Sequence, residues 1–307
     1  MAAIELEGLT KDYGEVLAAD ELTFDVEAGE IFGYLGPNGA GKTTTIRLLL
    51  GFISPTAGTA RVLGHDVRDR SGLIEAKRRI GYLSDEPGFD ERATGAEVLD
   101  LHASVKGDDR RAELLELFAP PLDRPVREYS SGNVQKLGLV TTFMHDPDLV
   151  VLDEPTSGLD PLMKQRFAEF LRAENERGVT VFFSSHVLSE VRRLCDRVGI
   201  VRQGRLVTVE PVETLLTRSG KAVRLHSATP IPTAVLDLEG VHDLETSGPD
   251  RTDDPDSTGT FTECAFTFTG DINALLEALS THVLLDCSIE EAPLEDVFLR
   301  FYGADDA

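Results

Sequence analysis

The chain has 307 residues, a length that accommodates one large domain or two ordinary ones, and we expect two. Its formal net charge is −24, with 54 acidic and 30 basic side chains, which argues against binding to nucleic-acid phosphates and predicts no nucleic-acid partner. No apolar run approaches the roughly 18 to 20 residues of a membrane-spanning helix, and no secretory signal precedes the first strand, so the expected compartment is the cytoplasm.

Strands and helices alternate through the first two thirds of the chain. Residues 4–9 and 22–26 are predicted to be short strands joined by a turn, and "AGEIFGYLGP" is predicted to be a strand that enters a glycine-rich loop before the helix "TTTIRLLLGF". Another strand ends at "IGYLSDEPG", and helices follow over about 92–145. From "DLVVLDEP" to "VGIVRQGRLV" strands and helices alternate again. This order predicts an α/β core, a largely parallel sheet covered by helices, with a helical insertion.

The pattern changes near residue 219. The segments from "KAVRLHS" to "HVLLDCSIE" are predicted to be strand, helix, strand, strand, helix and strand, the order of a ferredoxin-like β-α-β-β-α-β unit. "PLEDVFLRFYG" is predicted to be a final helix, and the acidic stretch 248–259 an exposed loop. We therefore expect one domain over 1–218 and a small α+β accessory domain over 219–307.

Three cysteines, Cys195, Cys264 and Cys287, are spread along the chain. Their odd number and the absence of a C-x-x-C pair argue against a disulfide framework or a zinc site, so we expect buried thiols.

The segment "GPNGAGKT" matches the pattern G-x-x-x-x-G-K-[ST]. In this pattern the backbone curls around phosphate oxygens, the lysine reaches the β and γ phosphates, and the hydroxyl binds Mg²⁺. A purely structural glycine turn is the alternative, but an apolar strand before the loop and a helix after it favour nucleotide binding. The residues expected to bind the nucleotide are Gly36, Pro37, Asn38, Gly39, Ala40, Gly41, Lys42, Thr43 and Thr44, with Thr43 as a metal ligand and Lys42 also catalytic.

The apolar strand "LVVLDEP" ends in two carboxylates. Asp153 is placed to hold Mg²⁺ through water, and Glu154 lies beyond it, where a carboxylate can orient the attacking water and accept its proton. Solvated acids at a strand end are the alternative, a weak one because buried strands rarely end in two acids without a cation.

Two further residues are candidates by position. His186 ends the strand "VTVFFSSH" at the same sheet edge, where it would sense and polarise the γ-phosphate; a structural histidine is the competing interpretation. Tyr13 follows the first strand within a turn, and its ring could stack on adenine. Spacing leaves stacking and a plain surface position equally open for Tyr13.

The segment "YSSGN", at 129–133, opens an expected helix with small polar residues and a glycine. Helix N-termini carry unpaired N–H donors and the positive end of the helix dipole, so this segment is a second candidate anion site. One chain with a complete phosphate loop has no obvious use for a second site.

These motifs make the chain resemble the nucleotide-binding subunits of ABC transporters over about residues 1–218. The resemblance rests on "GPNGAGKT", "YSSGN" before "VQKLGL", "LVVLDEP", the "SGLD" loop and "SSH", all in the family's order and spacing. It implies ATP and Mg²⁺ as cofactors and a head-to-tail homodimer, with each ATP between the phosphate loop of one chain and the "YSSGN" helix of the other. The residues implied to bind nucleotide from that side are Ser130, Ser131, Gly132, Asn133 and Asp160.

Two segments depart from the family pattern. The family signature reads L-S-G-G-Q, whereas Tyr129, Ser131 and Asn133 stand here in place of its leucine, first later glycine and glutamine. The strand "IGYLSDEPG" normally delivers a glutamine that contacts Mg²⁺ and the membrane domain. Asp85 is the nearest equivalent in this chain, and a carboxylate is a suitable Mg²⁺ ligand.

The resemblance implies an ATPase that powers a separate integral-membrane permease and is held by it at the inner face of the cell membrane. The C-terminal ninety residues look like those of daunorubicin-resistance exporter ATPases, which favours export; a generic dimerisation or stabilising extension is the alternative. A soluble ABC ATPase acting on nucleic acid, ribosomes or cofactor assembly is the second function considered. A nucleotide-responsive binding protein without turnover is the third, and the presence of Glu154 disfavours it.

The acidic composition has two interpretations. It is either an ordinary soluble surface or an adaptation to high salt, where the Debye length falls to about 3 Å at 1 M and repulsion between like charges is screened. We favour the second and expect a halophilic protein.

Overall fold

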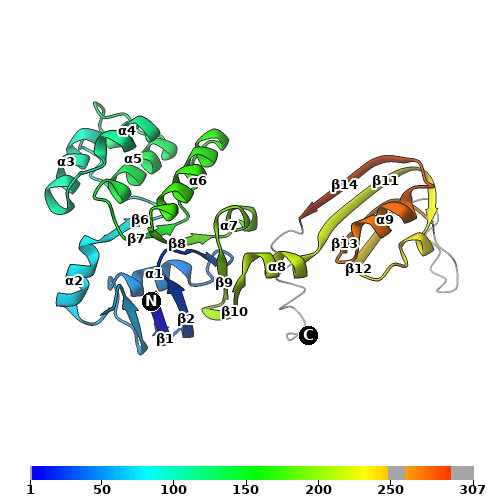
Figure 1. The fold of residues 1–307 in the computed structure, drawn as a ribbon, viewed down its shortest axis with the longest axis horizontal. Helices are drawn as coiled ribbons and strands as arrows, with labels where there is room; N and C mark the ends of the chain where they lie inside the picture. Colours follow the sequence, from blue (N-terminus) through cyan, green and yellow to red (C-terminus); the bar gives the residue numbers. More distant parts are fainter. Residues whose placement is uncertain (1, 248–259, 292–307) are drawn as a thin grey trace. The chain divides into compact units, whose positions relative to one another are not determined.

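The computed structural model describes residues 2–247 and 260–291 (Figure 1). The chain divides into two compact units, Met1–Val212 and Glu213–Ala307, where the sequence suggested a boundary after residue 218. Among the described residues no helix is long and apolar enough to cross a bilayer.

The first unit is built on a ten-stranded sheet in the order β5-β4-β1-β2-β10-β9-β3-β8-β7-β6. Strands β9, β3, β8, β7 and β6 run parallel, whereas β1, β2, β4 and β5 pair antiparallel. The strands of this unit are β1 Ala2–Asp12, β2 Leu17–Glu27, β3 Ile31–Leu35, β4 Ala57–Val62, β5 His65–Asp66, β6 Ile80–Leu83, β7 Leu149–Asp153, β8 Thr180–Ser185, β9 Arg197–Arg202 and β10 Arg205–Pro211.

Burial follows the sequence pattern of each strand. The apolar runs of β3, β7 and β8 are buried along their whole length, as parallel strands covered on both faces must be. In β2, Leu22 and Phe24 are buried and Thr23 between them is exposed, which is the alternation of a strand with one face toward solvent. Phe24 and Phe32 stack with ring centroids 5.4 Å apart, which joins β2 to the parallel part of the core.

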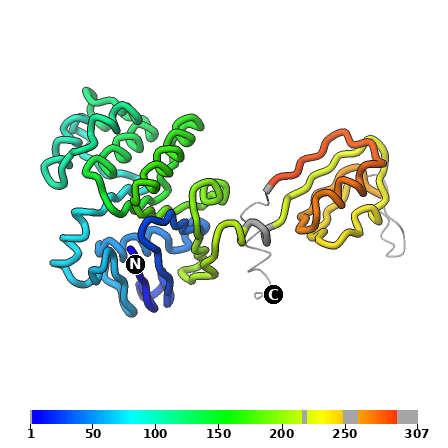
Figure 2. Tube along the Cα trace, viewed as in Figure 1, coloured from blue at the N-terminus to red at the C-terminus, as the bar shows by residue number. Residues whose placement is uncertain are grey.

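The helical insertion lies between β6 and β7 and contains α3 Gly95–Lys106, α4 Arg111–Phe118, the 3-10 helix η1 Val126–Glu128 and α5 Ser131–Phe143. In Figure 2 the cyan-to-green trace of these helices forms one cluster away from the blue strands β1 and β2. Thr94 and Glu97 form a reciprocal capping box that starts α3. The other helices of the unit are α1 Lys42–Leu49, α2 Arg70–Arg78, α6 Pro161–Glu176 and α7 Leu188–Leu194, and α8 Val212–Ser219 begins at its end. The predicted α/β core with a helical insertion is confirmed.

One predicted strand, "VGIVRQGRLV", is instead the hairpin β9–β10. Its two turn residues, Gln203 and Gly204, both have positive φ, 49° and 79°. Such a two-residue turn matches the twist of the flanking strands and reverses the chain. The turn of this hairpin also lines the pocket that contains the glycine-rich loop.

The second unit is a four-stranded antiparallel sheet in the order β12-β13-β11-β14. Its strands are β11 Lys221–Pro232, β12 Val241–Ser247, β13 Thr260–Phe268 and β14 Leu284–Glu291, and its helix is α9 Ile272–Leu279. Leu275 and Leu279 of α9 pack on Val223, Leu225 and Phe266, so the helix covers one face of the sheet.

Two predictions for this unit need correction. The first expected helix is only a four-residue 3-10 helix, η2 Thr233–Leu236, because Pro230 and Pro232 keep the chain extended and Gly240 ends the segment soon afterwards. Cys195 and Cys264 are buried as expected, but Cys287 is exposed; it lies on β14, which pairs only with β11 in the part of the chain that the structure describes. The predicted final helix and the acidic loop at 248–259 lie outside the described residues.

Candidate functional site

The glycine-rich loop connects β3 to α1 and is shaped by close backbone contacts. A side chain at Gly36 would lie 2.4 Å from the Val201 carbonyl oxygen, and one at Gly41 would lie 2.3 Å from that of Ala18. Gly41 also has φ of 102° where it begins α1. Only glycine fits these two positions, so the backbone is free to curl at the N-terminus of α1, where N–H groups face an anion.

Lys42 is the buried cation of the loop. Its ammonium donates hydrogen bonds to the carbonyl oxygens of Gly36 at 2.7 Å and Pro37 at 3.3 Å. It also lies 3.2 Å from Oε1 of Glu154. A buried ammonium at the mouth of a phosphate-type loop is the point charge that a nucleotide phosphate requires.

Thr43 and Asp153 bring two oxygens together at the start of α1 and the end of β7. The Thr43 hydroxyl donates to Asp153 Oδ2 at 2.9 Å, and the Ser184 hydroxyl donates to Oδ1 at 2.6 Å. The Asp153 residue is only 1% exposed. A hydroxyl beside a fixed carboxylate is an oxygen-only donor pair that fits Mg²⁺, which prefers a few protein oxygens together with phosphate and water.

Asp85 lines the same pocket as Thr43 and Asp153. Burial, followed by the charges of Asp153 and Glu154, raises the pKa of its carboxyl group above the usual value. Three carboxylates therefore line one pocket, but no three acidic, histidine or cysteine side chains of the described residues lie close enough together to form a metal site by themselves.

Glu154 is held in an unusual backbone conformation. Its φ is 49°, in the left-handed region, and its N–H donates to the carbonyl and the hydroxyl of Ser184, each at 3.2 Å. Oε2 of Glu154 lies 2.9 Å from His186 Nδ1, while Oε1 is buried and accepts no hydrogen bond despite the Lys42 ammonium nearby. Oε1 is thus ion-paired with Lys42 but takes no hydrogen bond, so the carboxylate keeps inside the site the accepting capacity that a general base needs.

One pocket of about 550 Å³ is lined by the loop residues 37–44 and by Asp85, Asp153 and Glu154, whereas Gly36 and His186 do not line it. Its volume is within the range of small-molecule sites. Tyr13 is 56% exposed and lines the rim together with the exposed residues Val16 and Leu17. Lys11 Nζ lies 5.0 Å from the centre of the Tyr13 ring. An apolar rim beside a phosphate-type loop suits a purine ring, and stacking of adenine on Tyr13 stays a prediction.

Part of this pocket was not predicted from the sequence. Val16, Leu17 and Ala18 of the first hairpin line it, as do Gln203 and Gly204 of the β9–β10 turn. The Gly204 N–H donates to the Ala40 carbonyl oxygen at 2.9 Å, so the turn supports the glycine-rich loop from outside. The "QG" dipeptide between two apolar runs was the available signal for that turn.

The second predicted anion site lies apart from this pocket. Ser130 caps α5 and accepts from the Asn133 N–H at 3.3 Å, and Asp160 caps α6 by accepting from the Met163 N–H at 2.9 Å. Neither residue lines the pocket, nor do Ser131, Gly132 and Asn133. A side chain at Gly132 would lie 2.7 Å from the Gly158 carbonyl oxygen, so this glycine lets α5 approach the loop before Asp160.

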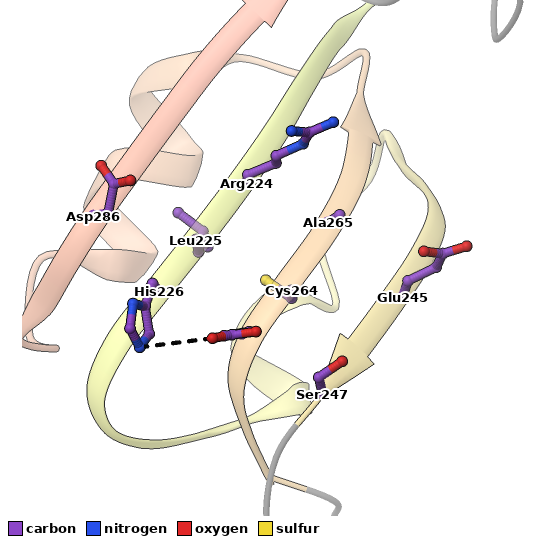
Figure 3. Close-up of a pocket in the computed structure, with 9 residues that line it drawn as sticks. Arg224, Leu225, His226, Glu245, Ser247, Cys264, Ala265 and Asp286 are labelled. Atoms are coloured by element: carbon purple, nitrogen blue, oxygen red, sulfur yellow. Dashed lines mark ion pairs between the residues drawn. The ribbon is translucent and has the colours of Figure 1, made fainter.

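A smaller hollow of about 290 Å³ lies on the sheet of the second unit (Figure 3). In Figure 3, Arg224 and His226 lie along β11, Glu245 along β12 and Asp286 on β14. His226 Nε2 lies 3.9 Å from Glu263 Oε1. The hollow mixes both charges on exposed side chains and has no glycine-rich loop, so the pocket of the first unit is the candidate catalytic site.

The family model described as "ABC transporter" matches residues 19–157. The daunorubicin/doxorubicin resistance ATP-binding protein of Streptomyces peucetius is 35% identical over 325 residues, covering 99% of this chain and 94% of that protein. A Nod factor export ATP-binding protein of Paraburkholderia xenovorans is 33% identical over 314 residues, covering 98% and 97% of the two chains. The match to an uncharacterized ABC transporter ATP-binding protein of Nostoc sp. is 42% identical and spans 66% of this chain and 62% of that protein.

Among solved structures, the chain is similar to an ATP-binding subunit of an ABC transporter. That match has a TM-score of 0.65 and 28% identity, and it covers 70% of this chain and 92% of the other.

Proposed function

Because the chain belongs to the ATP-binding proteins of ABC transporters, we propose that it binds ATP as a head-to-tail homodimer and drives a separate membrane permease, for export. As a member of this family it is an ABC-type ATPase. The observation that carries the proposal is the convergence of Lys42, Thr43, Asp153, Glu154 and His186 in and around one pocket.

Each residue has a distinct task in this proposal. Lys42 and the N–H groups of the glycine-rich loop hold the phosphates, while Thr43 and Asp153 would hold Mg²⁺, which neutralises phosphate charge when bound. Glu154 accepts the proton of the attacking water at its carboxylate group. His186 fixes the other oxygen of Glu154 and polarises the γ-phosphate.

The homodimer explains why one chain carries two anion sites. Ser130, Gly132 and the N-terminus of α5 do not line the pocket of their own chain, and in a twofold head-to-tail pair they would close the pocket of the partner. ATP then joins the two chains, and its hydrolysis lets them separate.

An exposed apolar surface supports a protein partner. Leu101 and Val105 lie one helical turn apart on α3 and are 65% and 73% exposed, and we call them the α3 surface. Apolar side chains grouped in this way mark interaction sites.

A groove next to this surface strengthens the case. It measures about 540 Å³ and includes Phe89, Val98, Leu101 and His102. Its first lining residue, Gly88, follows Asp85 of the catalytic pocket by three residues in the sequence. We propose that a cytoplasmic segment of the permease docks here, which would place the chain at the inner face of the cell membrane. Export is favoured by the relatives named for drug resistance and for export.

The docking surface can be tested with Leu101→Glu combined with Val105→Glu. Both side chains are exposed, so the variant is expected to fold and bind ATP like the wild type, yet to lose most of its co-purification with an integral-membrane protein from detergent-solubilised membranes. Ala173→Glu, on the exposed side of α6, is the control and should leave co-purification intact. Equal recovery of the membrane protein with the double variant would exclude this surface.

The proposed function as a whole is tested by steady phosphate release from ATP and Mg²⁺, together with co-purification of a membrane protein. Turnover without any membrane partner would favour a soluble ATPase. Absence of turnover in the presence of the membrane partner would contradict the proposal.

A further inference from the structure

Glu190 lies one turn after His186, in the short helix α7, and joins three elements around the catalytic pair. Its Oε1 accepts hydrogen bonds from the Thr156 hydroxyl at 2.6 Å and the Lys164 ammonium at 3.1 Å. Its Oε2 accepts from the Ser185 hydroxyl at 3.0 Å. The Glu190 side chain is only 14% exposed. Both oxygens of a mostly buried carboxylate are therefore used by neighbours from β8, α6 and the segment after Glu154.

The hydrogen bond from the Ser185 hydroxyl to Glu190 restrains the backbone on both sides of His186. Ser185 precedes His186 directly, and its hydroxyl also accepts from the Val187 N–H at 3.0 Å. The Ser185 carbonyl oxygen accepts from the Gly36 N–H at 3.3 Å, which fixes this strand end against the glycine-rich loop. The His186 ring is about half exposed, so few packing contacts restrain it and its position depends on the backbone that carries it.

The other oxygen keeps the Glu190 carboxylate in place. Thr156 lies two residues after Glu154 and is buried, and Lys164 lies in the first turns of α6. Glu190 is consequently bonded to Thr156, close to Glu154 in the sequence, and to Ser185, which precedes His186. A carboxylate held in this way can keep two segments at a constant separation.

We propose that Glu190 is a positioning residue for hydrolysis, holding His186 Nδ1 within hydrogen-bond reach of Glu154 Oε2. The inference rests on the proposed function, because it gives Glu190 a role only in the reaction that Glu154 and His186 perform. Glu190 itself does not line the nucleotide pocket, so its removal should affect turnover and leave nucleotide binding unchanged.

The test compares Glu190→Ala and Glu190→Gln with wild type in the full-length chain. Misplacement of a catalytic group by about 1 Å is enough for a hundredfold loss, so Glu190→Ala is expected to lower kcat by roughly tenfold to a hundredfold. KM for ATP and the Kd of ATP should stay within about threefold, because no pocket residue changes. Glu190→Gln keeps one acceptor oxygen and should recover part of the loss. Glu169→Gln removes the same charge from an exposed position on α6 and should match wild type.

A double-mutant cycle separates positioning from a general structural role. If Glu190 acts through His186, adding Glu190→Ala to His186→Ala causes no further loss of single-turnover rate. If the two residues act independently, the fold-losses of the two single variants multiply in the double variant. Should Glu190→Ala fail to fold, Ser185→Ala breaks the same link with a smaller change and should reproduce most of the loss in kcat.

Three results would overturn the inference: wild-type kcat in Glu190→Ala, a raised KM with unchanged kcat, or multiplied effects in the double variant. If wild type hydrolyses ATP and these results are found, only the role of Glu190 is rejected. If wild type itself does not hydrolyse ATP, the proposed function fails, and the role of Glu190 fails with it.

Discussion

Glu154→Gln is expected to bind ATP with Mg²⁺ and to accumulate as a stable dimer that hydrolyses it at least a hundredfold more slowly than wild type. The amide cannot accept the proton of the attacking water, and a positioned general base contributes roughly a hundredfold to ten-thousandfold to such reactions. Lys42, Thr43 and the glycine-rich loop are unchanged, so the contacts that bind phosphate remain. Size-exclusion chromatography with light scattering and a phosphate-release assay measure the two properties separately.

The dimer of this variant should persist because the step that separates the two chains no longer occurs. Glu176→Gln is a suitable control, since it removes one negative charge from the exposed end of α6. The control should behave like wild type in both assays. Hydrolysis at the wild-type rate by Glu154→Gln would remove Glu154 from the role of base.

Ser130→Arg is expected to abolish hydrolysis while the isolated chain still binds nucleotide. Ser130 caps α5 and lies outside the pocket of its own chain, so a long cation there leaves the glycine-rich loop unaltered. In a head-to-tail dimer the same side chain would occupy the space of the partner's nucleotide. Nucleotide titration of the monomer and phosphate release from the dimer test the two halves of this prediction.

Ser130→Ala is the matched control for the lost helix cap. Removing an N-cap hydroxyl costs about 1 kcal/mol of stability, and both variants lose it. Only the arginine blocks the proposed interface, so Ser130→Ala should retain much more activity than Ser130→Arg. Comparable activity in the arginine variant and wild type would contradict the head-to-tail arrangement.

Much of the catalytic pocket was predictable because its chemistry is local in sequence. The glycine-rich loop, Asp153 and Glu154, and His186 each end a short apolar run, and parallel strands carry such ends to one edge of a sheet. The parallel neighbours β3, β8 and β7 then place Lys42, His186 and Glu154 together.

The rest of the pocket depends on contacts between distant segments, which sequence patterns do not reveal. Ser184 holds Asp153 from the next strand, and the Gln203–Gly204 turn supports the glycine-rich loop from more than 160 residues away. Neither residue type signals a ligand site by itself. Strands β4 and β5 and helix α2 were also missed; β4 has only six residues, half of them exposed, and β5 only two, too few for a clear alternation.

In the second unit the order of strands could be predicted, but not the length of the first helix. Its apolar residues, such as Val235 and Leu236, are few, and two prolines before it leave room for only one turn. Helices shorter than a few turns depend on packing more than on sequence preference.

Mixing two inactive variants tests the central claim, that each ATP is held by two chains, most directly. Lys42→Ala lacks the phosphate-binding cation, and Ser130→Arg lacks a usable trans surface, so each homodimer should be inactive. Random pairing makes about half of the dimers mixed, each with one intact site out of two, so phosphate release should recover to about a quarter of the wild-type rate. A mixture that stays as inactive as its two components, although mixed dimers form, would contradict the account.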